Sequence, residues 1–392
     1  MQIEKITRPV WAEINLDHLA HNMREVRRLT KPEALCTAVI KADGYGHGAL
    51  EIGKTLLENG ADRFAVATLS EALQLKKRFP NVDILILGYT PNHLLSCVLD
   101  HQLIQTFYTF EQVSYFSNLA QEKKQIAKIH LKIDTGMHRI GMRVDSETLQ
   151  DIVKMTKMSN IEIEGIYTHF ATADDEDKTY TIGQVERFNS LVAELSKLGV
   201  EIPIRHVANS AAIIDLQECN YEMVRAGIMM YGLYPSNDVI KERVDLKPVM
   251  SLRAMVSHVK TIEKGEGVSY GLTYKTSQKE KIATIPIGYA DGFTRMFSGK
   301  AKALLKGHKV DVVGRICMDQ CMVNVTGLDC QQGDIITLFG EDNGEVISID
   351  EVAAYIGTIN YEIVCMIDKR VPRVYISKGE IVKVKDYLNC IE

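Results

Sequence analysis

Residues 38–49 read AVIKADGYGHGA, and this stretch sets the interpretation of the whole chain. An apolar run ends at Lys41, and three glycines and a tyrosine follow before an amphipathic segment begins. That order is typical of a β-strand, a tight turn and an α-helix. One such unit is compatible with many folds, so the fold depends on how often the unit recurs.

The unit recurs along the first part of the chain. Apolar runs that we interpret as strands occupy residues 37–41, 63–68, 83–87, 105–108, 129–134, 163–169, 204–208 and 223–226. Eight strand–helix alternations in about 200 residues fit a (β/α)8 barrel of the TIM type. A doubly wound open sheet fits less well, because eight units would exceed its usual strand count.

Amphipathic segments between these runs predict the helices. In the clearest one, apolar residues at helical spacing form one face: Ile182, Val185, Phe188, Val192 and Leu195. A second helix is expected after Ser70, which would be its N-cap, and Pro80 would help to end it.

The pattern changes after about residue 240, where short β-branched runs are separated by turns that contain glycine and aspartate. The strands predicted here are 249–259, 281–286, 302–305, 309–313, 320–325, 334–339 and 373–376, with a short helix at 349–356. We therefore predict an α/β chain with two domains. The N-terminal (β/α)8 barrel spans residues 13–240, and a second, mainly β domain comprises residues 1–12 and 241–392.

Composition excludes several classes of function. With 392 residues, of which 46% are hydrophobic, the chain can bury a large core in more than one domain. A net charge of -5, with scattered basic residues, argues against nucleic acid partners. No run approaches the roughly 18 apolar residues of a membrane helix, and no secretory signal opens the chain. The eight cysteines form no Cys-x-x-Cys pair, so we expect reduced thiols, no metal and a cytoplasmic location.

Polar residues follow several of the predicted strands. They are Lys41, Arg139, His169, Ser210 and Arg225. Because the carboxyl ends of barrel strands meet at one mouth, these residues describe a site. A partly desolvated lysine there would supply a neutral amine for Schiff-base chemistry. Taken alone, Lys41 is better explained as a solvated lysine that caps a strand, since most lysines are surface charges.

The loops after the seventh and eighth strands suit a phosphate group. Ser210 is placed as the N-cap of a helix, next to Asn209, and Gly227 follows the last strand. Barrels commonly bind phosphate with these two loops and a helix N-terminus. Each feature alone is an ordinary cap or turn, and no Walker or Gly-x-Gly-x-x-Gly motif is present.

Together these segments resemble the alanine racemase family, the pyridoxal 5'-phosphate (PLP) enzymes of fold type III. The matching motifs run in family order through nearly the whole chain: 39–48, 132–141, 206–210, 224–228, 267–271, 288–292, 314–319 and 358–362. One departure is His138, where the family often has glycine before the arginine; it bears on the shape of that loop.

The resemblance implies a two-base reaction. Lys41 would hold PLP covalently and then act on one face of the substrate carbon. Tyr270, from the second domain of a partner subunit, would act on the other face. By residue type alone, Tyr270 is a packed strand aromatic. His169 and Arg225 match the hydrogen-bonded groups behind this phenol, and Arg225 also matches the residue that faces the pyridine nitrogen.

The remaining roles also come from the resemblance. The cofactor-binding set comprises Lys41, Tyr45, His169, Asn209, Ser210, Arg225, Gly227, Ile228 and Tyr361. Arg139 and the backbone amide of Met318 match the groups that bind the substrate carboxylate. Lys132 matches a lysine that is often carbamylated, and Tyr289 and Asp319 match residues that narrow the entry.

The implied protein is a homodimer with composite active sites that interconverts L-alanine and D-alanine and supplies D-alanine for peptidoglycan. A serine or broad-specificity racemase on the same scaffold is an alternative, although Tyr361 favours alanine over larger substrates. A single-barrel PLP carrier would lack the second domain. A fold type III decarboxylase would need a glycine-rich phosphate loop, which the sequence does not contain.

Overall fold

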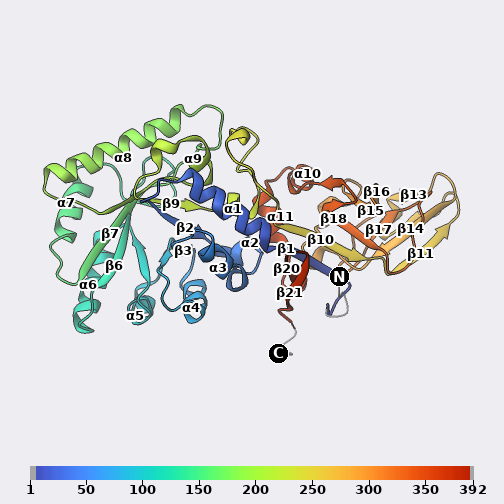
Figure 1. Cartoon of the computed structure of the whole chain (residues 1–392), viewed down its shortest axis with the longest axis horizontal. Helices are drawn as coiled ribbons and strands as arrows, with labels where there is room; N and C mark the ends of the chain where they lie inside the picture. The colour runs from blue at the N-terminus through green and yellow to red at the C-terminus, as the bar shows by residue number, and fades with distance from the viewer. Residues whose placement is uncertain (1–5, 389–392) are drawn as a thin grey trace. The chain divides into compact units, whose positions relative to one another are not determined.

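The computed structural model describes residues 6–388, and the chain divides into two compact units (Figure 1). The barrel unit comprises Leu19–Gly44 and Ala49–Lys247. The β unit comprises the chain up to His18, the short segment Tyr45–Gly48 and the chain from Pro248 onward. The domain boundaries given by the sequence, at residues 12/13 and 240/241, stay a prediction.

The barrel unit contains a parallel eight-stranded sheet. Its strands are β2 (Leu35–Val39), β3 (Arg63–Val66), β4 (Ile84–Ile86), β5 (Ile104–Phe107), β6 (Ala127–Lys132), β7 (Ile161–Tyr167), β8 (Ile204–His206) and β9 (Met223–Ala226). Their order is β8-β7-β6-β5-β4-β3-β2-β9. The Arg225 N–H donates to the Ala208 carbonyl at 3.0 Å, which links β9 to the residues after β8. The predicted barrel architecture is confirmed.

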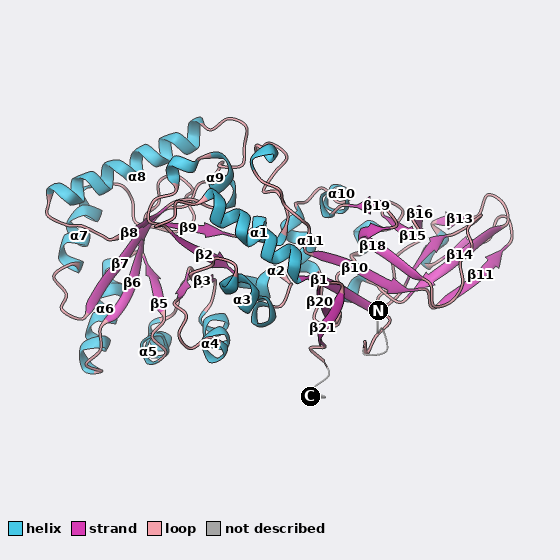
Figure 2. Cartoon of the chain, viewed as in Figure 1, coloured by secondary structure: helices cyan, strands magenta, loops and turns pink. Residues whose placement is uncertain are grey.

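Helices follow the strands and lie outside the sheet (Figure 2). They are α1 (Leu16–Leu29), α3 (Ala49–Glu58), α4 (Leu69–Arg78), α5 (Leu95–Asp100), α6 (Phe110–Glu122), α7 (Ser146–Met155), α8 (Thr179–Lys197) and α9 (Ser210–Asp215). The strands are buried on both sides: all four residues of β3 are buried, although one of them is Arg63. This is the pattern expected when one face of a parallel sheet meets helices and the other fills the barrel.

Two details of the predicted helices are wrong. The buried face of α8 includes Gln184, Phe188 and Leu195, whereas Ile182 is half exposed. Gln184 faces the interior, because its side-chain amide accepts a hydrogen bond from the Ala171 N–H and donates one to the His169 carbonyl. The N-cap of α4 is Thr68 rather than Ser70.

The β unit is built on an eleven-stranded sheet. Its strands are β1 (Val10–Asn15), β10 (Met250–Met255), β11 (His258–Ile262), β14 (Glu280–Ile285), β15 (Lys302–Leu305), β16 (His308–Val313), β17 (Cys321–Asn324), β18 (Ile335–Asp342), β19 (Glu345–Ile347), β20 (Arg373–Ser377) and β21 (Glu380–Lys385). Separate from it are the ribbon of β12 (Gly267–Val268) and β13 (Tyr274–Lys275) and the helices α10 (Ile349–Ala354) and α11 (Asn360–Met366). The predicted mainly β character is confirmed.

The predicted strand 249–259 is two strands. β10 pairs with β1 and β18, whereas β11 pairs with β14. Between them, Val256 and Ser257 donate to Asp334 and Thr284, on two different neighbours. The strand β1, which was not predicted, lies between β10 and β20, both far away in sequence.

Among residues 6–388, no helix is long and apolar enough to cross a membrane. In the same range, no cluster of three or more His, Cys, Asp or Glu side chains could hold a metal ion.

Candidate active site

Lys41 opens a strained turn. The segment α2 (Lys41–Tyr45) is left-handed at its centre, with φ of 51° at Ala42 and 52° at Asp43. This conformation costs a non-glycine residue about 1–2 kcal/mol. Two hydrogen bonds hold it: Ala42 N–H donates to Glu71 Oε1 at 2.6 Å, and Asp43 Oδ1 accepts from Ala49 N–H at 2.9 Å. Strain that the surroundings hold in place is typical of functional sites.

The glycines after this turn belong to the β unit and pack against its other residues. Arg373 Nε donates to the Gly46 carbonyl at 2.9 Å. A Cβ at Gly46 would lie 2.4 Å from the carbonyl oxygen of Val364, so only glycine fits there. This packing buries Tyr45, whose ring centroid lies 6.2 Å from that of Tyr361. The structure thus brings these two predicted cofactor residues together.

Arg225 is buried in the barrel and is almost fully hydrogen-bonded. Nη1 donates to Nδ1 and the carbonyl oxygen of His206, at 2.7 and 2.9 Å. Nη2 donates to the carbonyls of Thr168 and Val207, and reaches His169 Nδ1 at 3.3 Å. These contacts use all four Nη–H groups of the guanidinium. The Nε–H donates to no atom of the described residues.

His169 is neutral and surrounded by cations. Burial, followed by the positive charge of Arg225, holds the pKa of His169 well below its usual value. Arg139, Lys132 and Lys41 lower it further, so these predicted residues gather around one imidazole. Nη2 of Arg225 lies 3.3 Å from Nδ1 and can only donate, sharing its hydrogens with two carbonyls, so the single ring proton of neutral His169 is on Nε2.

Lys132 and Arg139 differ in their surroundings. Lys132 ends β6, is 3% exposed and donates to the Ile133 carbonyl at 2.7 Å. Burial, followed by the charge of Arg225, lowers the pKa of the Lys132 amine to about 7. Arg139 is exposed and has no hydrogen-bond or ion-pair partner among residues 6–388.

The loops after β8 and β9 meet at Ser210. Asn209, not Ser210 as predicted, is the N-cap of α9: its side chain accepts from Ala212 N–H at 3.0 Å. Ser210 Oγ is thereby free to accept from the Gly227 N–H at 2.9 Å. The hydroxyl keeps its own proton to donate. The N–H of Ile228, a fully buried residue, donates to no atom within the described range.

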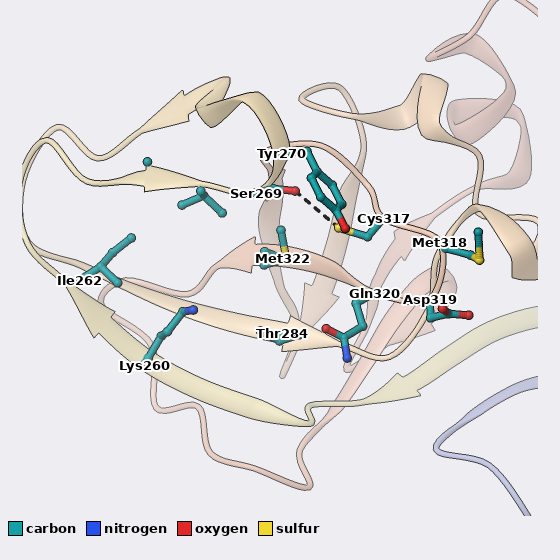
Figure 3. A pocket seen from close by; sticks show the side chains of 12 residues that line it. Lys260, Ile262, Ser269, Tyr270, Thr284, Cys317, Met318, Asp319, Gln320 and Met322 are labelled. Atoms are coloured by element: carbon teal, nitrogen blue, oxygen red, sulfur yellow. Dashed lines mark hydrogen bonds between the residues drawn. The ribbon is translucent and has the colours of Figure 1, made fainter.

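Three of the remaining predicted residues line a cavity of about 580 Å³ in the β unit (Figure 3). Tyr270, Met318 and Asp319 lie on its wall, together with Ser269 and Cys317. The Tyr270 side chain is 69% exposed, and its hydroxyl has no partner in the part of the chain that the structure describes.

Hydrogen bonds hold the loops of this cavity together. Tyr289 N–H donates to the Cys317 carbonyl at 3.0 Å, and the Asp319 carboxylate accepts from Arg370 at 2.7 Å. The Met318 carbonyl accepts from Ala290, but the Met318 N–H donates to nothing within residues 6–388. The predicted site residues are therefore divided between the two units, and the β unit holds both the Tyr45–Tyr361 pair and the residues of this cavity.

Family models match both units. The model of the alanine racemase N-terminal domain matches residues 14–235, and that of the C-terminal domain matches residues 249–375. The chain belongs to the alanine racemase family. Alanine racemase 1 of Clostridium acetobutylicum is 47% identical over 382 residues, covering 97% of this chain and 99% of the relative. Alanine racemase of Methanococcus maripaludis is 47% identical over 95% of this chain and all of its own length.

Solved structures agree. Alanine racemase of Clostridium difficile 630 superposes with a TM-score of 0.94 at 45% identity, covering 98% of this chain and all of that one. A histidine racemase of Leuconostoc mesenteroides has a TM-score of 0.87 at 27% identity, covering 95% of this chain and 99% of its own. The alanine racemase fold is thus shared by an enzyme named for another substrate.

The motifs of the alanine racemase family did not reveal the polar interior of the barrel. His130, Glu164 and His206 are buried and hydrogen-bonded behind Arg225. The available signal was the placement of ionisable residues inside apolar strand segments, such as 129–132, which read IHLK. Burial of such residues requires partners, which the sequence alone does not identify.

Proposed function

We propose that the protein is an alanine racemase that interconverts L-alanine and D-alanine with PLP as its cofactor. Family membership supports the reaction. One observation in the barrel, the hydrogen bonding of Arg225, supports the assignment of PLP binding to the residues around it. All Nη–H groups of Arg225 are occupied, and the remaining Nε–H is a donor without a partner among the described residues. A neutral pyridine nitrogen is an acceptor that suits this donor.

The residues fit the cofactor. Lys41 would bind its aldehyde covalently, and the Ser210 hydroxyl and Ile228 N–H are donors suited to its phosphate. Asn209, Gly227, Tyr45 and Tyr361 would complete the phosphate site. When bound, PLP withdraws electrons from the substrate's α-carbon.

Arg225 keeps the ring nitrogen unprotonated. A guanidinium donates hydrogen bonds and gives up its proton very reluctantly. Burial lowers the pKa of Arg225 only to about 10, so it stays charged at neutral pH. Arg225 therefore limits how much charge the ring accepts, which disfavours side reactions.

Lys41 and Tyr270 would exchange the α-proton from opposite faces. A free phenol is a poor base at neutral pH, since its pKa is near 10. The Nε2–H of neutral His169 would donate to the phenolate oxygen of the partner's Tyr270 and so stabilise the charged form.

Arg139 and the Met318 N–H would bind the substrate carboxylate. Neither has a partner within residues 6–388, and a guanidinium can bond both carboxylate oxygens. Lys132, with a pKa of about 7, is partly neutral at physiological pH and therefore able to add CO2. The resulting carbamate would attract Arg139, which an ammonium would repel. Tyr289 and Asp319 would narrow the entry.

The active unit would be a homodimer in which Tyr270 and Met318 serve the partner's barrel. Large apolar side chains of the β unit support an interface: Tyr270, Leu272, Met296 and Met318 are all more than half exposed. Isolated exposed apolar residues are normal, but two of these, Tyr270 and Met318, line the same cavity, as expected of an interaction surface.

The cellular role would be to supply D-alanine for peptidoglycan in the cytoplasm. The seven cysteines in the described range are free thiols, which suits a reducing compartment. A serine or broad-specificity racemase is the second candidate, because a histidine racemase has a closely similar fold.

The test is a chiral assay of purified protein and added PLP with L- and D-alanine, and with both serine enantiomers. We expect alanine to racemise in both directions and faster than serine. Tyr270→Phe should bind the cofactor and lose most activity. Lys41→Ala should lack the visible absorption of the lysine-bound cofactor, and borohydride should no longer attach the cofactor to the protein. Full activity of Tyr270→Phe in both directions would contradict the two-base assignment.

A further inference from the structure

A continuous line of hydrogen bonds runs through the barrel interior from Arg225 to a carboxylate. His206 Nε2 lies 2.8 Å from His130 Nδ1, and His130 Nε2 lies 2.7 Å from Glu164 Oε2. With the 2.7 Å contact between Arg225 and His206 Nδ1, this makes three consecutive bonds. We call Glu164, His130, His206 and Arg225 the imidazole relay. His130 and His206 are fully buried.

Only one arrangement of the ring protons satisfies every hydrogen bond of the imidazole relay. Arg225 can only donate, so His206 Nδ1 must accept and its proton must lie on Nε2. That proton is donated to His130 Nδ1, which places the second ring's proton on Nε2, facing Glu164. Adding a proton to either ring would set two donors against each other at 2.7–2.8 Å.

The electrostatic surroundings are consistent with two neutral imidazole rings between the positive Arg225 and the negative Glu164. Burial lowers the pKa of both histidines, and the charge of Arg225 lowers that of His206 further. Burial alone would raise the pKa of Glu164, but bonds from His130 and Arg63 outweigh it and bring it to about 2. The charged or titratable groups that face the rings are Arg63 on β3, Lys132 on β6, Glu164 and Tyr167 on β7, and Arg225 on β9.

The strands are shaped to place these groups. The β6–β7 register shifts between Ile129 and His130, so that Ile129 faces Ile163 and His130 faces Gly165. Glu164 is the extra residue of this bulge, and bulges re-aim side chains. A Cβ at Gly165 would lie 2.6 Å from His130 Nδ1, so glycine leaves room for the ring. Tyr167 stacks on His206 at 4.5 Å between centroids.

We propose that Glu164 and His130 are positioning residues, which hold His206 as a fixed acceptor and thereby orient the Arg225 guanidinium for the reaction. Arg225 has no carboxylate within ion-pair distance among residues 6–388, so the relay is its connection to a negative charge. The consequence for catalysis rests on the proposed function, whereas the proton arrangement does not.

The first test is the histidine side-chain ¹⁵N spectrum of the intact holoenzyme, which does not measure activity. We expect His130 and His206 to carry their protons on Nε2 and to show no titration between about pH 6 and pH 9. A proton on Nδ1 of either ring, or titration in this range, would overturn the proposal.

The second test compares two variants at position 130. His130→Gln preserves the polarity, because its amide can accept from His206 and donate to Glu164, whereas His130→Leu breaks the relay. We expect kcat of His130→Leu to fall about tenfold with little change in KM, as for other groups that orient a catalytic residue. His130→Gln should recover most of that loss.

Equal kcat in the two variants, whether both wild-type or both low, would refute the positioning role. If His130→Leu does not fold, the wild-type spectrum and the activity of His130→Gln still decide. Absence of cofactor binding or racemisation by the wild-type protein, with the predicted spectrum intact, would instead refute the proposed function.

Discussion

At residue 138 the chain carries histidine in a backbone conformation that favours glycine. His138 has φ of 55° and is exposed, and its N–H donates to Asp134 Oδ1 at 3.1 Å. The same carboxylate oxygen accepts from Gly136 and Met137, so Asp134 determines the loop shape in place of a glycine. The departure from glycine at position 138 is therefore accommodated by hydrogen bonds from the loop before Arg139 to Asp134.

We expect His138→Gly to raise the free energy of unfolding by about 1 kcal/mol, since glycine adopts this φ without a steric penalty. The ion pair of His138 with Asp134 is exposed and contributes little. Urea unfolding measures the effect. His138→Ala is the matched control, because it removes the imidazole but keeps the Cβ; an equal gain in both variants would contradict the backbone explanation.

Lys132 should give stability a pH dependence. Its folded pKa of about 7 is below the value of 10.5 in the unfolded chain. Between these values the unfolded chain binds the extra proton, so the free energy of unfolding should rise with pH, by up to about 1.4 kcal/mol per unit. Below about pH 7 both states are protonated, and the dependence disappears.

Unfolding of CO2-depleted protein from pH 7 to pH 10 measures this slope. Lys132→Met should lose it, whereas Lys54→Met, at an exposed lysine, should keep it. The pKa prediction is wrong if the Lys132 variant and the wild-type protein have the same slope.

Among the secondary-structure elements, helix α4 shows why an N-cap prediction based on residue type alone can be wrong. The N-cap predicted from sequence is Ser70, but Thr68, two residues earlier, also has a hydroxyl. Thr68 is the cap because Glu71 closes a capping box: Thr68 Oγ1 accepts from Glu71 N–H, and Glu71 Oε2 accepts from Thr68 N–H at 3.1 Å. Glu71 Oε1 also holds the turn after Lys41.

Thr68→Ala should lower the free energy of unfolding by about 1 kcal/mol, the usual value of an N-cap hydroxyl. Ser70→Ala, two residues later and inside the helix, should change the free energy of unfolding by much less. Urea unfolding of the two variants compares them directly, and a larger effect at Ser70 would restore the cap predicted from sequence.

At the scale of the whole molecule, Lys41 and Tyr270 lie in different units, and the proposed reaction needs both. If Tyr270 serves the partner's barrel, a dimer of one Lys41→Ala and one Tyr270→Phe subunit has one intact site. An equal mixture that exchanges subunits should therefore recover roughly a quarter of wild-type activity through random pairing.

The mixture is assayed after subunit exchange has been verified by differently tagged subunits. Each variant alone is the control and should stay nearly inactive. Verified hybrids with no more activity than the parents would show that each chain completes its own site.

The sequence by itself determined the barrel, the mainly β unit and the family's catalytic motifs, because these depend on local periodicity and on short segments such as 39–48. Only the tertiary structure decided which polar groups meet. Glu164 and His206 lie on different strands and reach each other through His130. The pairing of β1 with β10 likewise joins residues about 240 positions apart. Such contacts depend on strand order, register and a bulge, which no local pattern specifies.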